Sequence, residues 1–201
     1  MRSNFTQIFS KIVLGIAALY FLYLFSHAIS IANRRHMGTE DGTYVNNTRS
    51  NTQLQTLALK LTQDCVNKTC QVQNVLDYVS NIPYKINHFQ AHTPQKTIQE
   101  NFGDCDDKSN LLISLLHQLN IKSYFVLVPK HIFVIVSLDS FKNKHARKAL
   151  YLNGEAYYIL ESTAPNSPIG FPLRYKLNEI KTIIEPFKNK KIPIKNLEWK
   201  L

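Results

Sequence analysis

Acidic residues and glycine are scarce in this chain, and cysteine is almost absent. The 201 residues include 6 Gly and 8 Pro, so the sequence is neither collagen-like nor of low complexity. Three Cys are too few for a small disulfide-rich scaffold, and they lack the paired spacing of a metal site. No phosphate-binding loop and no nucleic-acid motif occurs. We therefore expect no metal, no other cofactor and no nucleic-acid partner.

The shortage of acidic side chains makes the chain basic. There are 14 Asp and Glu against 24 Lys and Arg, which gives a net charge of +10. Four of the cations and none of the acids lie in residues 1–35, so the rest of the chain carries +6. That excess suits an anionic membrane surface or an envelope polymer. Hydrophobic residues make up 44% of the chain, enough to bury a core and to exclude a disordered protein.

One long apolar segment lies near the amino terminus. Residues 12–32 contain no charged side chain, and as a helix they would span roughly 30 Å, the thickness of the hydrocarbon core of a membrane. A cleavable signal peptide, with Arg2 and Lys11 as its basic region, is one interpretation. We favour an uncleaved transmembrane anchor over residues 12–32, after a flank of residues 1–11, because the segment is long for a signal peptide. This predicts a single-pass membrane protein whose soluble domain faces the periplasm or the cell exterior.

A polar stretch and two helical segments follow the apolar segment. Residues 33–52 have no apolar periodicity, and we interpret them as a solvated linker. Over residues 54–79 apolar side chains recur at helical spacing, which predicts two helices interrupted around Cys65 and Cys70. Residues 85–101 are mostly polar, and we expect a loop there.

The pattern changes from helix to strand after residue 103. Five leucines between Leu111 and Leu119 form one stripe for a buried helix face. Short β-branched and aromatic runs follow, and Asn153-Gly154 is a strong signal for a hairpin turn. The expected strands are residues 123–128, 132–138, 149–152 and 155–161. We therefore predict an α+β domain over residues 53–186. The basic tail, residues 187–201, is either a solvated extension or a segment that binds an anionic surface.

The sequence Gly-Asp-Cys-Asp-Asp-Lys-Ser at residues 103–109 is the strongest indication of chemistry. It places Cys105 in or just before the first turn of the leucine-rich helix. Unpaired amides and the positive end of the helix dipole stabilise a thiolate there, although the charges of Asp104 and Asp106 oppose it. A lone cysteine is usually a small buried hydrophobe, but so many neighbouring charges do not suit core packing. Cys105 is therefore a candidate nucleophile.

A thiol nucleophile needs a base, and the base needs a group that orients it. His131 stands at the start of one expected strand, and Glu161 closes another. Neighbouring strands of a sheet can hold these two side chains next to each other; a surface His and a surface Glu are the alternative. Cys105, His131 and Glu161 are thus the candidate catalytic residues.

These residues resemble the bacterial transglutaminase-like superfamily, and more closely its cysteine-proteinase members with a Cys-Asp-Asp-Lys-Ser signature. The resemblance covers about residues 54–175 and rests on residues 103–109, on the strand led by His131 and on residues 157–163. It implies a papain-like α+β core, with the nucleophile at the amino end of a helix packed on an antiparallel sheet and a catalytic order of Cys, His, Asp or Glu. Two departures stand out: Glu161 replaces the commoner Asp, and the usual Ala-Trp after the histidine is Ile-Phe here.

The expected activity is that of a thiol hydrolase cleaving peptide or amide bonds of a protein or peptide substrate. Cys105 would attack the carbonyl carbon and form a thioester, His131 would protonate the leaving amine, and Glu161 would orient the imidazole. The backbone N–H of Cys105 would stabilise the oxyanion, with Gln99 as a candidate second donor that is otherwise a solvated loop residue. Two alternatives stay open, a protein-crosslinking transglutaminase and a non-catalytic binding or assembly module of the cell envelope.

Cys65 and Cys70 are the other two cysteines, with four residues between them. In an oxidising compartment they could close a small loop as a disulfide. Two reduced cysteines on successive helical turns are the alternative. A disulfide would leave Cys105 as the free thiol. The sequence does not indicate the oligomeric state.

Overall fold

A computed structural model describes residues 4–33, 36–39, 42–87, 91–138 and 147–201. The chain divides into two units, Met1–His36 and Met37–Leu201. The first consists mainly of the long helix α1 (Asn4–Asn33), whose apolar side chains between Ile8 and Ile29 are exposed. Within α1, the segment Thr6–Ile29 is long and apolar enough to cross a membrane, with a mean hydropathy of 2.1. A membrane anchor and a signal sequence both have these properties.

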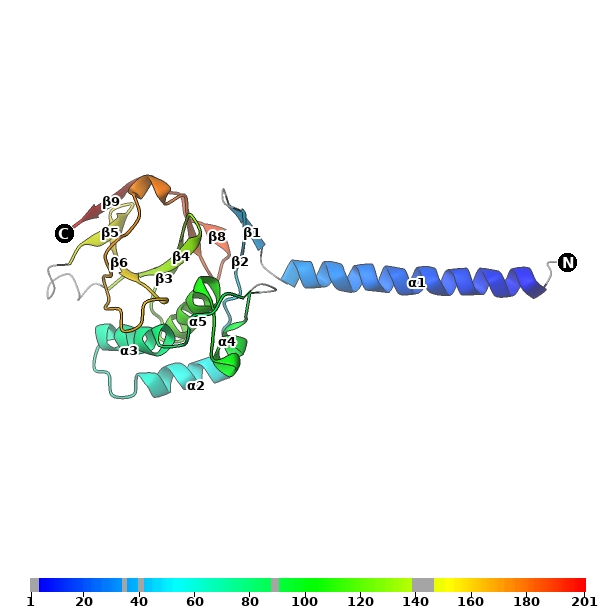
Figure 1. Ribbon diagram of the computed structural model, residues 1–201, viewed down its shortest axis with the longest axis horizontal. Coiled ribbons are helices and arrows are strands. Elements are labelled where there is room, and N and C mark those ends of the chain that lie inside the picture. Colours follow the sequence, from blue (N-terminus) through cyan, green and yellow to red (C-terminus); the bar gives the residue numbers. More distant parts are fainter. Residues whose placement is uncertain (1–3, 34–35, 40–41, 88–90, 139–146) are drawn as a thin grey trace. The chain divides into compact units, whose positions relative to one another are not determined.

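The second unit is a layer of helices packed on an antiparallel sheet, which confirms the predicted α+β class (Figure 1). Helix α5 lies at the centre of the helical layer, against β3 and β4, and the other three helices of the layer pack around it. The helices are α2 (Thr52–Leu61), α3 (Lys68–Ser80), α4 (Pro94–Glu100) and α5 (Cys105–Gln118), and a 3-10 turn η1 spans Leu177–Glu179.

Seven strands form the sheet in the order β8-β7-β3-β4-β6-β5-β9. Its centre is the tight hairpin of β3 and β4, in which Val128 pairs with His131 across a two-residue turn. The Asn153-Gly154 turn joins β5 and β6 as predicted, and both residues have positive φ. The strands are β3 (Ser123–Val128), β4 (His131–Val136), β5 (Ala149–Leu152), β6 (Glu155–Leu160), β7 (Thr182–Glu185), β8 (Lys190–Lys191) and β9 (Leu197–Lys200); β1 (His36–Thr39) and β2 (Gly42–Val45) form a separate two-stranded sheet.

Apolar clusters lie on both faces of the large sheet. On β4, Ile132 and Val134 belong to the cluster that contains the leucine stripe of α5. Phe133 and Ile135 belong to the other cluster, which the segment 171–177 and β9 help to cover. Alternate residues of a strand point to opposite faces, so burial of both faces explains the nearly continuous apolar runs in the sequence.

The predicted solvated linker, residues 33–52, differs from the structure. Strands β1 and β2 lie within it, and Asn46 and Asn47 after them are buried. Asn46 donates a side-chain hydrogen bond to the carbonyl of Pro186, and the Asn47 N–H donates to Asn110 Oδ1 at 2.9 Å. Polar side chains can be buried when their hydrogen bonds are satisfied, so a polar composition did not mean a solvated segment.

The basic tail, residues 187–201, is not the solvated extension that was one of its two interpretations. Strands β8 and β9 form the two edges of the large sheet, and Trp199 of β9 pairs with Leu150 of β5. Leu197 and Trp199 pack against the second apolar cluster. The run Leu-Glu-Trp-Lys alternates between apolar and charged residues, but it is too short to be distinguished from a coil by periodicity.

Helix α4 lies inside the segment predicted to be a loop. Thr93 caps it by accepting a hydrogen bond from the Lys96 N–H at 3.3 Å, and Pro94 occupies its first turn. Threonine followed by proline is a recognised signal for a helix start. Seven residues are too few to show the apolar periodicity on which the prediction relied.

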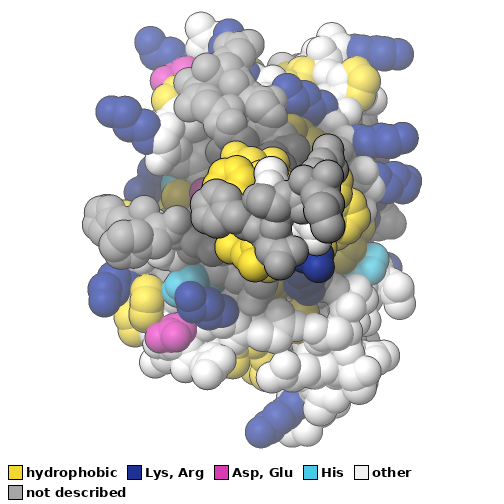
Figure 2. Space-filling view, turned by 90° about the vertical axis from the view of Figure 1, so that its right-hand side faces the viewer, with side chains coloured by type: hydrophobic (Ala, Val, Ile, Leu, Met, Phe, Trp, Pro, Cys, Tyr) yellow, Lys and Arg dark blue, Asp and Glu magenta, His cyan; other side chains and the backbone are white. Residues whose placement is uncertain are grey.

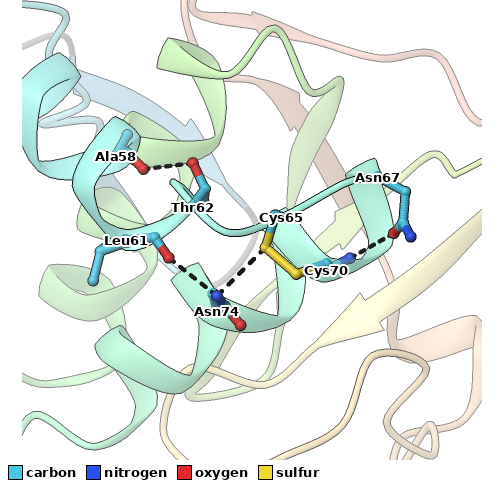
Figure 3. Close-up of a disulfide and its surroundings, with 7 residues drawn as sticks. All are labelled: Ala58, Leu61, Thr62, Cys65, Asn67, Cys70 and Asn74. Carbon is cyan, nitrogen blue, oxygen red and sulfur yellow. Dashed lines mark hydrogen bonds between the residues drawn. A yellow bond between two sulfur atoms is a disulfide. The ribbon is translucent and has the colours of Figure 1, made fainter.

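Cys65 and Cys70 form a disulfide between α2 and α3 (Figure 3). Within the closed loop Asn67 caps α3 by accepting a hydrogen bond from the Cys70 N–H at 2.9 Å. Asn74 of α3 donates to Cys65 Sγ at 3.4 Å. The disulfide therefore joins the loop after α2 to the first turn of α3, and it leaves Cys105 as the free thiol.

Candidate active site

Helix α5 begins at Cys105 because Asp104 caps it. Oδ1 of Asp104 accepts hydrogen bonds from the backbone N–H groups of Asp106 and Asp107, both at 3.1 Å, and the Asp107 carboxylate accepts one from the Asp104 N–H. This reciprocal capping satisfies amides that have no partner inside the helix. A Cβ at Gly103 would lie 2.8 Å from Asp107 Cβ, so glycine allows the chain to pack closely against the helix start. These contacts fix the position of the Cys105 backbone.

His131 and Glu161 are brought together by the adjacent strands β4 and β6. Nε2 of His131 lies 2.9 Å from Oε2 of Glu161. Oε1 of Glu161 accepts hydrogen bonds from the N–H and the hydroxyl of Thr163, at 3.0 and 2.6 Å. Burial raises the pKa of Glu161, but the hydrogen bonds from His131 and Thr163 outweigh it and hold that pKa below its usual range. Glu161 is therefore ionised at neutral pH.

The Cys105 thiol differs from the expectation of a stabilised thiolate. Burial, together with the charges of Asp106 and Asp104, raises the pKa of Cys105 to about 12. Hydrogen bonds from the N–H groups of Ile132 and Asp106 favour the thiolate but do not outweigh those effects. The thiol donates to Asp106 Oδ1 at 3.7 Å. The amino end of the helix does not activate Cys105 by itself, so a base is required.

The Cys105 sulfur lies beside the strand that carries His131. The Ile132 N–H that interacts with this sulfur belongs to the residue directly after His131. Because Nε2 of His131 binds Glu161, Nδ1 is the ring nitrogen that remains to accept a proton from a thiol. Among the described residues the thiol is bound to Asp106 and not to His131, so it must turn toward His131 before it can react.

The sequence offered two oxyanion donors, the Cys105 N–H and the Gln99 side chain, and only the first lies at the site. The Asp104 side chain caps the N–H groups of the two residues after Cys105, and among the described residues no hydrogen bond of the Cys105 N–H competes with an oxyanion. Gln99 lies on α4 with an exposed side chain, and no described contact links it to Cys105.

Tyr84 was not singled out by the sequence, and it reaches the site because its backbone forms a bridge with Gly103. Burial and the charges of Cys105, Asp104 and Asp106 raise the pKa of Tyr84, so its phenol keeps its proton.

Two further residues of the motif hold α5 in place. Lys108 is buried, and its Nζ donates to the carbonyls of Ser80 and Ile82 at 3.0 and 2.7 Å. Burial lowers the pKa of Lys108 to about 8. Oγ of Ser109 lies 3.2 Å from Oγ of Ser162, which directly follows the candidate acid. These contacts link the helix that starts at the thiol to the end of α3 and to the end of β6.

Two of the three acidic residues around Cys105 serve the fold in this structure. Asp104 and Asp107 cap α5, and the buried Asp107 also accepts a hydrogen bond from the His92 N–H. Burial and the charges of Asp104 and Asp107 raise the pKa of Asp106 to about 6. Within the described ranges, no group of three or more His, Cys, Asp or Glu side chains is arranged to hold a metal ion.

A family model and solved structures of two other proteins are similar to this chain. The family model of a transglutaminase-like domain matches residues 52–188. No curated protein matches the sequence. A proposed cysteine protease from Cytophaga hutchinsonii is 19% identical, with a TM-score of 0.45 over 74% of this chain and 48% of that protein. A proposed protease from Parabacteroides distasonis is 14% identical, with a TM-score of 0.46 over 71% of this chain and 27% of that protein. The chain thus spans about half of the first and about a quarter of the second.

Proposed function

Because the chain belongs to the transglutaminase-like domain family, we propose that it is a membrane-anchored thiol hydrolase that cleaves peptide or amide bonds. One observation carries the proposal, the 2.9 Å contact between His131 Nε2 and Glu161 Oε2. The N–H of Ile132, the residue directly after His131, interacts with the Cys105 sulfur at the capped start of α5, which supports a thiol near this pair. In the proposal Cys105 is the nucleophile, His131 the general base and Glu161 the group that orients the imidazole.

The reaction begins with transfer of the Cys105 proton to Nδ1 of His131. A thiol with a pKa of about 12 is protonated at neutral pH, so the reaction needs this transfer. The thiolate attacks the carbonyl carbon, and the oxyanion forms near the Cys105 N–H. His131 then gives its proton to the departing amine, which leaves a thioester on Cys105. Water that loses a proton to His131 attacks the thioester, the bond to sulfur breaks, and His131 returns the proton to Cys105. Glu161 stabilises the imidazolium in both halves of the reaction.

A non-catalytic binding module is the rival function, and one observation favours it. In the structure the thiol is held by Asp106 and its pKa is raised to about 12, as expected of an unreactive cysteine. Transfer of the acyl group to an amine would make the protein a cross-linking transglutaminase. We prefer hydrolysis, since water needs no second substrate site.

We propose that α1 anchors the protein in a membrane and that the domain lies on the periplasmic or outer side. The disulfide Cys65–Cys70 supports an oxidising compartment. Thr6–Ile29 supports membrane insertion, and retention of α1 in the mature protein would distinguish an anchor from a signal peptide. Figure 2 shows Lys and Arg side chains around the outline of one face, standing apart from one another and not gathered in one patch.

The test is the rate of Cys105 alkylation by iodoacetamide as a function of pH, compared between the full chain and its His131→Ala variant. Cys105 is the free thiol, and the other two cysteines are bonded to each other, so iodoacetamide reports on one site. We expect the wild type to react at least about tenfold faster than His131→Ala at pH 7, because His131 supplies the base. His117→Ala, which removes an exposed histidine near the other end of α5, is the control. An alkylation profile that is unchanged by His131→Ala would transfer the assignment to the binding module.

A further inference from the structure

A cavity of about 330 Å³ lies beside the His131–Glu161 pair. Both residues form part of its wall, so a group bound in it lies next to the proposed base. The volume is at the lower end of the range of about 300–1,000 Å³ that is typical of ligand pockets. It is large enough for one extended side chain and its neighbour in a peptide.

The floor of the cavity is apolar and aromatic. Phe133 and Ile159 are buried beneath it, and Phe171, Leu173 and Tyr175 line it from the segment after β6. Along that segment half-buried and exposed residues alternate, so these three residues face the sheet while the residues between them face solvent. The ring planes of Tyr175 and His131 are nearly parallel, with an angle of 18° between them. Such a surface accommodates an aromatic or aliphatic side chain.

The rim of the cavity is positively charged. Lys130 and Arg174 line it, and both side chains are exposed. Lys130 occupies the turn directly before His131 with a positive φ of 60°, a conformation unusual for lysine. Arg174 lies over the Phe171 ring at 4.8 Å, which holds the guanidinium above the floor. Within the described part of the chain neither cation forms an ion pair.

The carboxylate in the wall, that of Glu161, is bonded to other residues of the site and not to these cations. Both oxygens of Glu161 already accept hydrogen bonds, Oε2 from His131 and Oε1 from Thr163. The cavity therefore offers two exposed cations above an apolar floor and no uncommitted carboxylate among its lining residues. The group that complements this arrangement is an apolar side chain with a carboxylate next to it.

We propose that this cavity is a substrate subsite that selects peptide segments in which an aromatic or aliphatic residue adjoins Asp or Glu. Its role as a substrate subsite rests on the proposed hydrolase function, since only then does the bound peptide lie beside a reacting Cys105. Lys130 and Arg174 bind the acidic side chain, and the floor formed by Phe133 and Tyr175 holds its neighbour.

The test measures peptide binding without catalysis. The full chain carrying Cys105→Ala, in detergent micelles, is titrated calorimetrically with N-acetyl-Phe-Glu-amide and with the uncharged N-acetyl-Phe-Gln-amide. We expect the Glu peptide to bind about fivefold more tightly at low salt and the preference to shrink at high salt, as for partly exposed ion pairs. The double variant Lys130→Gln/Arg174→Gln should bind the Glu and Gln peptides with about equal affinity. Lys60→Gln, which removes an exposed cation on α2, should retain the preference.

A second variant separates charge from packing. Arg174→Lys keeps the positive charge but loses the planar contact with Phe171, so it should retain most of the preference for the Glu peptide. Equal binding of the two peptides, or no binding at millimolar concentration, overturns the subsite. That result would leave the alkylation test of Cys105 unaffected. A Glu preference in a chain whose alkylation does not depend on His131 would support acidic-peptide binding and refute the hydrolase.

Discussion

His131 and Glu161 are 30 residues apart in the sequence, and their side chains lie 2.9 Å apart. The antiparallel register of β4 and β6 explains the contact. Val134 pairs with Leu160, and continuing this register by one residue puts Glu161 opposite Phe133, diagonal to His131. Diagonal neighbours are about 7–8 Å apart at the backbone, within reach of a long side chain. The length of a glutamate side chain suits this separation.

Shortening or neutralising Glu161 should therefore impair the proposed base. Glu161→Asp places the carboxylate too far from His131, and Glu161→Gln keeps a hydrogen bond but loses the charge that stabilises an imidazolium. We expect each variant to lower Cys105 alkylation at pH 7 by roughly tenfold or more. Glu155→Gln, at the start of the strand that ends just before Glu161, is the control and should alkylate as the wild type does.

The lowered pKa of Glu161 also predicts a pH-dependent stability. A carboxyl with a lowered pKa stabilises the fold above its unfolded-state pKa, and this stabilisation is lost as pH falls through the folded-state pKa. The difference in unfolding free energy between wild type and Glu161→Gln should shrink below about pH 4. Urea unfolding at pH 7 and pH 3.5 measures it, and a difference that is independent of pH would contradict the assignment.

Asp106→Asn should make Cys105 more reactive. The substitution removes one of the two carboxylate charges that raise the thiol pKa, together with the carboxylate that accepts the thiol proton. We expect alkylation between pH 8 and 10 to become about three- to tenfold faster. Asp64→Asn removes an exposed carboxylate beyond the end of α2 and should have no effect.

The raised pKa of Asp106 has a consequence for stability. Its folded-state pKa of about 6 lies above the ordinary value, so the wild type loses stability as pH rises from about 4 to 6. The Asn variant lacks this titration and should become more stable relative to the wild type over that range. Unfolding free energies that fall in parallel in the two proteins would show that Asp106 does not titrate this way.

Lys108→Met should destabilise the fold by about 2–4 kcal/mol in urea unfolding at pH 7. The lysine donates to two buried carbonyls, of Ser80 and Ile82, which methionine would leave without this donor. Because the folded-state pKa is about 8, below the ordinary value, the contribution of Lys108 should grow as pH rises from about 8 to 10.5. The exposed Lys60→Met should change stability by less than about 0.5 kcal/mol. Equal effects of the two substitutions would refute a structural role for Lys108.

Gly103→Ala should disturb the start of α5. The added Cβ would meet Asp107 Cβ at 2.8 Å and a methyl of Thr97 at 3.2 Å, and Asp107 cannot move without losing the cap. We expect a loss of about 1–3 kcal/mol in unfolding free energy and slower alkylation of Cys105. Gly15→Ala has open space around its Cβ and is the matched control. If Gly103→Ala is as stable as the wild type, the start of α5 can move to make room for the added Cβ, and the close packing at Gly103 is not required.

Local patterns predicted the elements that are long or that carry a specific turn signal. The leucine stripe predicted α5, and Asn153-Gly154 predicted the β5–β6 hairpin. Helix α4 and strand β9 were missed because each is too short to show a period. The burial of Asn46 could not be predicted, since its hydrogen-bond partner Pro186 is 140 residues away.

The sequence by itself determined that Cys105 begins a helix. A helix cap and a leucine stripe are formed by residues close together in the chain, so both can be identified without the tertiary structure. The sequence also proposed His131 and Glu161 as the base and its orienting acid. Only the tertiary structure decided that their side chains meet, since the meeting depends on the register of two strands. The tertiary structure likewise decided the state of the thiol. Burial and the charges of Asp106 and Asp104 depend on the folded surroundings, and together they outweigh the local effect of the helix amino end.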